Sequence, residues 1–212
     1  MLYDKDIREP LFFFLEESYG KVRILEEKNV GGSRADVVMV RENMICGVEI
    51  KSDADSYVRL AGQVADYDEF FDRNYLVVGS SHAMSAAEHV PEYWGLISVE
   101  EDGDKADFYV IREASDNPNR DIKKKLGFLW RPELADIQAM NAMPKYAQFS
   151  KKAVIDKIAE KVPEGLLHAQ ISEELFERDY NRIFDKINEY RAEKGLKKKR
   201  KRSYRRRAGR KG

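Results

Sequence analysis

Two short apolar runs, residues 37–40 and 45–48, constrain the fold of this chain most strongly. Their length and the short connection between them are typical of a β-hairpin. Asp36 precedes the first run, and Glu49 and Lys51 end the second. Because side chains alternate along a strand, Glu49 and Lys51 are expected to point the same way. Asp36 on the neighbouring strand is expected to lie beside Glu49, so that three charged groups converge at one edge of a sheet.

Two carboxylates held this close repel each other, so either a pKa rises or a cation binds. Mg²⁺ fits such a pair because it prefers oxygen ligands and keeps several waters. Metal-assisted hydrolysis is the chemistry of this arrangement, with Lys51 orienting water or stabilising developing charge. The alternative is a solvated ion pair, since Glu-x-Lys is common at strand ends. The separation of 13 residues between Asp36 and Glu49, with a hairpin between them, favours the metal site.

The sequence around these residues resembles the PD-(D/E)XK nuclease superfamily. The resemblance is carried by Asp36, by Glu49-Ile50-Lys51 and by Gln63 with Tyr67, which form the Gln-x-x-x-Tyr element of RecB-like members. Residues 26–78 are most similar to the MmcB-like bacterial branch, which is associated with DNA repair. Ala35 stands where the name-giving proline is found, which removes a backbone constraint but no functional group.

This resemblance, which covers about the first half of the chain, implies an α/β fold. The expected core is a restriction-endonuclease-like mixed β-sheet flanked by helices. The implied function is that of a metal-dependent deoxyribonuclease, which hydrolyses DNA phosphodiester bonds in DNA repair, recombination or the processing of mobile-element or phage DNA. Mg²⁺ is the implied cofactor, with Mn²⁺ as a substitute, and DNA is the implied partner. Because many members act as dimers, the resemblance is also compatible with a homodimer.

The resemblance assigns roles to individual residues. It assigns metal ligation to Asp36, Glu49 and the carbonyl of Ile50, and catalysis to Lys51. Gln63 and Tyr67 would support the lysine end of the site or contact the substrate backbone, although a purely structural role for Tyr67 in the core is an open alternative.

The sequence gives less information about which residue is the third acid and about the role of the basic residue Arg34. Glu26 precedes Asp36 by 10 residues, as a strand glutamate does in the MmcB-like branch, so it is the preferred third acid. Glu9, Glu16 and Glu17 of the first helix are the alternatives. Arg34 shares the strand face of Asp36. It is expected either to pair with a carboxylate or to hold a DNA phosphate.

The remaining pattern of the first half predicts alternating helices and strands. A helix is expected over residues 4–19, with its regular part beginning at Pro10, because proline fits only the first turn. The other expected elements are a strand at 22–27, a helix at 57–72 capped by 53–56, a strand at 75–79, a short helix at 83–89, and strands at 96–99 and 105–112.

After residue 115 the composition predicts helices only. The expected domains are a nuclease-like core (1–114), a helical module (115–196) and a basic tail (197–212). The expected helices span 121–125, 132–143, 150–161 and 169–178, with continuation to 194 and breaks at 144 and 163–165. Residues 153–184 have the order of a DNA-binding helix-turn-helix. The second helix of this segment is acidic, however, which favours packing or substrate shaping over DNA reading.

Charge is divided unevenly along the chain. Residues 197–212 hold 11 of the 38 Lys and Arg residues and no acids, so residues 1–196 carry 27 basic against 38 acidic side chains. We expect the tail to be disordered alone and to bind phosphates without sequence preference. Alternatively, it is a solvated terminus or folds back on the acidic body. The expected phosphate-binding residues are Lys197, Lys198, Lys199, Arg200, Lys201, Arg202, Arg205, Arg206 and Arg207.

Several classes are disfavoured by what the sequence lacks. No apolar run approaches the roughly 18 residues of a membrane helix, and charged residues close to Met1 argue against a signal peptide. Cys46 is the single cysteine, so no internal disulfide forms, which fits a cytoplasmic location. Two other classes compete with the nuclease: a non-catalytic nucleic-acid-binding protein of nuclease-like fold, and an interaction module whose acidic body binds a basic partner.

Overall fold

The computed structural model describes residues 2–103, 105–179, 188–189, 191–192 and 197. The chain divides into two compact units, Met1–Glu177 and Arg178–Gly212. The basic tail and the continuation of the last predicted helix lie outside the described residues, apart from the few positions given above.

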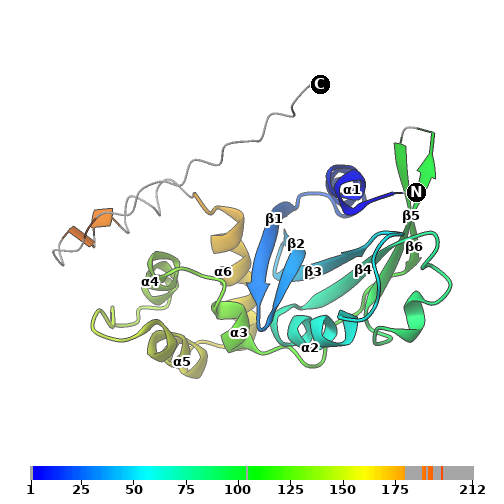
Figure 1. Ribbon diagram of the computed structural model, residues 1–212. Coiled ribbons are helices and arrows are strands. Elements are labelled where there is room, and N and C mark those ends of the chain that lie inside the picture. Colours follow the sequence, from blue (N-terminus) through cyan, green and yellow to red (C-terminus); the bar gives the residue numbers. More distant parts are fainter. Residues whose placement is uncertain (1, 104, 180–187, 190, 193–196, 198–212) are drawn as a thin grey trace. The chain divides into compact units, whose positions relative to one another are not determined.

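The first unit is built on a six-stranded mixed sheet with strand order β1-β2-β3-β4-β5-β6 (Figure 1). The first three strands pair antiparallel, β3, β4 and β5 pair parallel, and β5 and β6 pair antiparallel. The predicted α/β class is therefore confirmed. The strands are β1 (Arg23–Val30), β2 (Ser33–Arg41), β3 (Met44–Lys51), β4 (Arg73–Gly79), β5 (Gly95–Asp102) and β6 (Lys105–Arg112).

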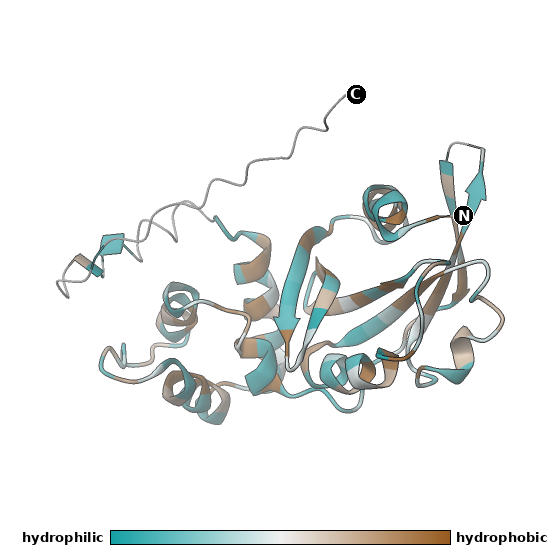
Figure 2. Cartoon of the chain, viewed as in Figure 1, coloured by the Kyte–Doolittle hydropathy of each residue, from teal (hydrophilic) through white to brown (hydrophobic). Residues whose placement is uncertain are grey.

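Helices cover both faces of the sheet, and each face has its own apolar core. Helix α1 (Asp4–Tyr19) packs on one face through Ile7, Leu11 and Leu15. The other face carries α2 (Leu60–Phe70), and α6 (Glu164–Phe176) packs against β2 and β3. Figure 2 shows hydrophobic residues on the inner strands, whereas β1 is largely hydrophilic. The remaining helices are α3 (Ile122–Leu126), α4 (Arg131–Met140), α5 (Lys151–Lys161) and the 3₁₀ helix η1 (Ala86–Glu88).

The predicted hairpin is present as β2 and β3. Val37 pairs with Val48, and Arg41 pairs with Met44 across the turn. Asn43 in this turn has φ of 61°, a left-handed conformation that asparagine tolerates better than most residues. This register matters for function because continuing it by one residue places Asp36 opposite Glu49.

Two details of the predicted helices differ from the structure. Helix α1 has the predicted bounds, Asp4–Tyr19, but its regular part does not begin at Pro10, because the helix runs through that residue. The cost is small because the carbonyl deprived of a donor belongs to Asp6, which is exposed to water. Helix α2 begins at Leu60, three residues after the predicted start at Tyr57. The preceding segment forms a turn instead, in which the Asp55 carboxylate accepts hydrogen bonds from Ser52.

The C-terminal half also differs from its predicted boundaries. Helix α6 begins at Glu164, inside the segment predicted to be a break, because Pro163 serves as its N-cap and needs no backbone donor. Residues 83–89 contain only one 3₁₀ turn. The predicted helix-turn-helix segment extends beyond residue 179, outside the described part of the chain. No described helix is both long and apolar enough to cross a membrane.

A buried charged cluster joins the C-terminal helices to the sheet. The Asp72 carboxylate accepts hydrogen bonds from the Ile45 amide at 2.7 Å and from Lys125 Nζ at 2.5 Å. His168 Nδ1 lies 3.2 Å from the other oxygen of Asp72. Leu126, Leu134, Ile158 and Leu167 from helices α3 to α6 also belong to the apolar cluster that contains α2. These helices thus share a core with the sheet, whereas the domain boundary expected at residue 115 remains a prediction.

Candidate active site

The two motif carboxylates lie together at the carboxyl end of β3. Glu49 is 1% exposed, although it belongs to a residue type that is seldom buried without partners. Asp36, at the start of β2, accepts a hydrogen bond at its Oδ2 from the amide of Ile50 at 3.0 Å. Asp36 is therefore fixed to the backbone next to Glu49, as the hairpin register requires.

Both oxygens of Glu49 have side-chain donors. Oε1 accepts from Lys51 Nζ and from Gln63 Nε2, each at 2.5 Å. Oε2 accepts from the Tyr67 hydroxyl at 2.5 Å. Lys51 also donates to Gln63 Oε1 at 3.0 Å, which closes a ring of contacts among three residues. The structure thus brings together every residue of the Glu-x-Lys and Gln-x-x-x-Tyr motifs.

Tyr67 links the carboxylate pair to the core. Its hydroxyl accepts a hydrogen bond from the Asp36 amide at 3.2 Å while donating to Glu49. Its ring is fully buried and packs against Phe71 and Trp94. Tyr67 is therefore part of the core and at the same time hydrogen-bonded to both motif acids, so its position is compatible with both roles considered from the sequence.

Burial and charge perturb the acid-base properties of this cluster. The pKa of Glu49 is raised, first because burial disfavours its charged form and then because Asp36 is close; Lys51 opposes the rise. The pKa of Tyr67 is raised well above its ordinary value by burial and by the charge of Glu49. Tyr67 therefore remains a hydrogen-bond donor at neutral pH. The part of the rise in the Glu49 pKa that Asp36 causes reflects repulsion between the two carboxylates, which additional positive charge would offset.

Helix α1 contributes a residue that sequence reasoning missed. Arg8 places its Nη2 atom 2.8 Å from Oδ1 of Asp36 and 3.1 Å from Oε1 of Glu27. Its Nε atom lies 2.7 Å from Oδ2 of Asp4. The one sequence signal was the spacing of four residues between Asp4 and Arg8, which indicates a helical ion pair but not its position beside Asp36.

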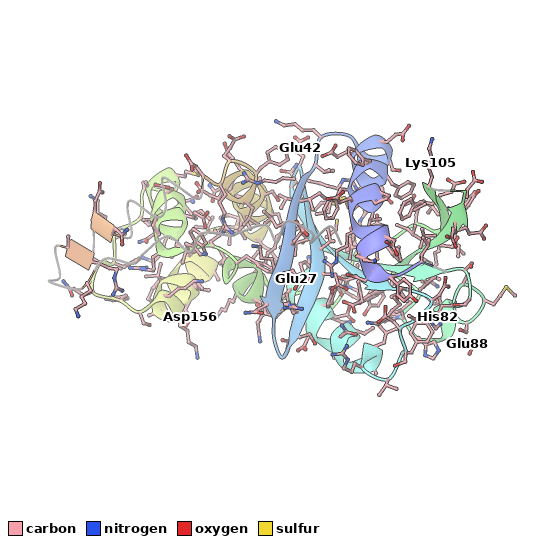
Figure 3. All side chains as sticks on the ribbon, turned by 45° about the horizontal axis from the view of Figure 1, so that its top comes forward. Glu27, Glu42, His82, Glu88, Lys105 and Asp156 are labelled. Carbon is pink, nitrogen blue, oxygen red and sulfur yellow. The ribbon has the colours of Figure 1, made fainter. Side chains whose placement is uncertain are left out.

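The third acid expected from sequence is not at the site. Glu26 is exposed, pairs with Val37 across the β1–β2 ladder, and does not line the cleft described below. Its neighbour Glu27 (Figure 3) falls opposite Asp36 at an irregular position, with φ of 56°. Glu27 forms ion pairs with Arg8 and Arg34, and Arg8 in turn contacts Asp36. The exposed residues Glu9, Glu16 and Glu17 do not line the cleft either.

A cleft of about 900 Å³ opens beside the carboxylates. Asp66 of α2 shapes one wall, because it accepts hydrogen bonds from Gly32 and Ser33 in the β1–β2 turn. Gly31 has φ of 56°, and a Cβ there would lie 2.1 Å from Oδ1 of Asp66, so any other residue would be strained and would displace the Asp66 carboxylate. Arg34 lines the cleft and is 64% exposed, with its Nε atom 2.6 Å from Glu27. Both roles considered for Arg34 thus stay compatible with its position.

The oxygen atoms at the cleft suit a hard cation that is held by only a few protein ligands. Within the described residues, no group of three or more His, Cys, Asp or Glu side chains is arranged to hold a metal ion. Two carboxylates, Asp36 and Glu49, do meet at the cleft, and Ile50 between Glu49 and Lys51 also lines it. Mg²⁺ commonly uses one or two carboxylates and keeps several waters, so this pair fits Mg²⁺ better than a cation that needs a protein cage.

Fold and site together define a mixed α/β protein with a buried acid–lysine cluster at an open cleft. The chain belongs to the family of bacteriophage P4 protein cII, whose family model matches residues 10–200. No curated protein has a sequence that matches this chain. One solved structure, described as SfsA of Pyrococcus furiosus in complex with Ca²⁺, is similar at 16% identity and a TM-score of 0.34. The similarity covers 52% of this chain and 62% of that one. A likeness of this size supports no conclusion about fold or activity.

Proposed function

We propose that this chain is a metal-dependent deoxyribonuclease with a PD-(D/E)XK-type site on a restriction-endonuclease-like core. The observation that carries the proposal is the environment of Glu49. This buried carboxylate is held by Lys51, Gln63 and Tyr67, and it lies beside Asp36. The raised pKa of Glu49 comes in part from the charge of Asp36, which a bound cation would offset, and the position of both carboxylates at the cleft gives that cation access to substrate.

Each residue of the site has its own proposed role in hydrolysis. Asp36 and Glu49 would hold Mg²⁺, with the Ile50 carbonyl as a further ligand. When bound, the ion supplies a water of lowered pKa and polarises a phosphoryl oxygen. Lys51 carries its positive charge at the same cleft, where it orients the attacking water or stabilises charge developing on the phosphate. Gln63 and Tyr67 hold Glu49 in one orientation, so little reorganisation is needed during the reaction.

DNA is the proposed substrate because the cleft also offers cations to phosphates. Arg34 and Arg59 line it and are exposed. The basic tail would add sequence-independent and salt-sensitive affinity. Membership in the family of a bacteriophage protein favours mobile-element or phage DNA processing among the pathways considered.

The proposal is tested by cleavage of labelled linear, circular, single-stranded and branched DNA with Mg²⁺, Mn²⁺ or EDTA. Wild type is compared with Asp36→Asn, which keeps the size of the side chain and removes its charge. Metal-dependent cutting that is lost in the variant supports the nuclease and defines its preferred substrate. The absence of cutting with either metal on every substrate contradicts it.

One observation favours a second candidate, a non-catalytic nucleic-acid-binding protein. Both carboxylates already have cationic partners, Arg8 for Asp36 and Lys51 for Glu49. A site that is neutralised internally does not need a metal ion for its stability. This candidate predicts salt-sensitive DNA binding that is the same with Mn²⁺ and with EDTA, and no cleavage.

A further inference from the structure

Arg8 supplies the positive charge that compensates Asp36 in this structure. Its guanidinium contacts Oδ1 of Asp36 at 2.8 Å and the backbone carbonyl of the same residue at 3.3 Å. The other carboxylate oxygen, Oδ2, accepts the Ile50 amide at 3.0 Å. The two oxygens of Asp36 thus have different partners, the arginine at Oδ1 and a backbone amide at Oδ2.

The arginine is held tightly by charge. Its side chain is 18% exposed and lies among three carboxylates, those of Asp4, Glu27 and Asp36. The guanidinium group of arginine is protonated at any pH at which a protein is folded. Arg8 therefore remains a cation under all ordinary conditions. A divalent ion that approached Oδ1 of Asp36 would meet this charge at contact distance and be repelled.

We infer that Arg8 is an internal counter-ion of Asp36 that competes with a divalent metal ion for this carboxylate and so sets the metal affinity of the site. This inference rests on the proposed function. Arg8 can release Asp36 without being left unpaired, because Asp4 and Glu27 remain as partners on its other sides. Arg8 is thus a positioning residue: it keeps Asp36 in place before the metal binds and yields to it afterwards.

The test is a calorimetric titration of Mn²⁺ into the full-length protein without DNA, together with thermal melting. Removing one charge-assisted contact to Asp36 is expected to strengthen Mn²⁺ binding by about tenfold in Arg8→Gln. The metal-free variant should melt at a lower temperature than wild type, because the carboxylates of Asp4, Glu27 and Asp36 lose the cation that they share. Mn²⁺ should raise its melting temperature more than it raises that of wild type.

Two further variants make the result decisive. Arg8→Lys keeps the charge, but its compact ammonium cannot contact three carboxylates at once, so its affinity should lie between those of wild type and Arg8→Gln. Arg73→Gln is the matched control, because Arg73 pairs with Asp116 away from the site and its loss should leave Mn²⁺ affinity unchanged. A merely structural role for Arg8 would weaken metal binding when the residue is replaced.

The outcomes separate this inference from the proposed function. If wild type binds Mn²⁺, Asp36→Asn loses binding and both Arg8 variants bind no more tightly than wild type, the inference fails and the metal site stands. If neither wild type nor any variant binds Mn²⁺, both fail. Tighter binding by Arg8→Gln, with Arg8→Lys intermediate, supports the inference.

Discussion

The hydroxyl of Tyr67 donates a hydrogen bond of 2.5 Å to Oε2 of Glu49 and, from within the core, holds the carboxylate that the site depends on. The same hydroxyl accepts the amide of Asp36, so a single oxygen connects both motif acids. The packing of α2 against the sheet therefore determines the geometry of the site, and changes to that packing should affect catalysis and stability together.

Tyr67→Phe removes this connection while keeping the ring. Because the lost bond involves a charged acceptor, the free energy of unfolding should fall by about 1.5–3 kcal/mol. Urea unfolding measures this change. Tyr109→Phe is the control, since the Tyr109 hydroxyl bonds Asp107 at an exposed position and its loss should change stability by less than about 0.5 kcal/mol. Equal effects of the two substitutions would argue against a bracing role for Tyr67.

Lys51→Ala is expected to abolish cleavage with little effect on folding or metal binding. Glu49 loses its cation, but its raised pKa lets it take up a proton, and a bound metal would replace the missing charge. Loss of one charge-stabilising donor should slow single-turnover cleavage by about 100-fold or more. Lys105, an exposed residue on β6 (Figure 3), gives the control substitution Lys105→Ala. An unchanged cleavage rate in Lys51→Ala would remove this lysine from the mechanism.

Asp72→Asn tests the buried cluster that joins α3 and α6 to the sheet. Burial alone would raise the pKa of Asp72, but hydrogen bonds from His168 and Lys125 outweigh it, so the pKa is lowered. Because the unfolded chain then binds the proton more tightly, the stability that Asp72 contributes is present above its unfolded pKa of about 3.9 and is lost as the pH falls through its folded pKa.

The expected loss in Asp72→Asn is about 3 kcal/mol at pH 7, because the buried ammonium of Lys125 loses the carboxylate that compensates its charge. The difference from wild type should shrink below about pH 4. Denaturant unfolding between pH 3 and 7 measures both quantities. Asp116→Asn, which removes an exposed pair with Arg73, should cost less than about 0.5 kcal/mol throughout. A difference that grows as the pH falls would contradict this account.

Gly47→Ala tests how closely α2 approaches the sheet. A Cβ at Gly47 would lie 2.3 Å from the Phe71 ring and 2.7 Å from the Tyr67 ring, so both rings must move. The free energy of unfolding should fall by about 1–3 kcal/mol. Gly62 lies within α2, and a Cβ added there would meet no atom within 4 Å beyond its own helix. The free energy of unfolding of Gly62→Ala should therefore rise by about 0.5 kcal/mol. Chemical denaturation compares the two, and equal stability would show that the Gly47 contact is not limiting.

The sequence predicted the parts of this molecule that depend on local pattern. The strand alternation that puts Glu49 and Lys51 on one face, and the hairpin that puts Asp36 beside them, both follow from the spacing of apolar residues. The edge strand β6 was also predicted with its observed bounds. In the β2–β3 hairpin and in β6, the local backbone preference and the pattern of apolar residues both predict the strand that is observed.

What the sequence could not predict depends on contacts between distant segments. The contact of Arg8 with Asp36 joins residues 28 positions apart through the packing of α1, and no local pattern indicates it. The sequence favoured Glu26 as the third acid, and the irregular backbone at Glu27, with φ of 56°, was not visible in the strand pattern. The late start of α2 followed from Asp55, whose carboxylate stabilises a turn that competes with the helix.

The central claim is tested most directly by the rate of Mn²⁺-dependent DNA cleavage in wild type and in Glu49→Gln. Glutamine keeps the shape of the buried side chain and removes its negative charge. We predict that wild type cleaves with Mn²⁺ and not with EDTA, and that Glu49→Gln still binds DNA but cleaves it at least about 100-fold more slowly. Cleavage at the wild-type rate by Glu49→Gln, or none by wild type with either Mg²⁺ or Mn²⁺, would contradict the account.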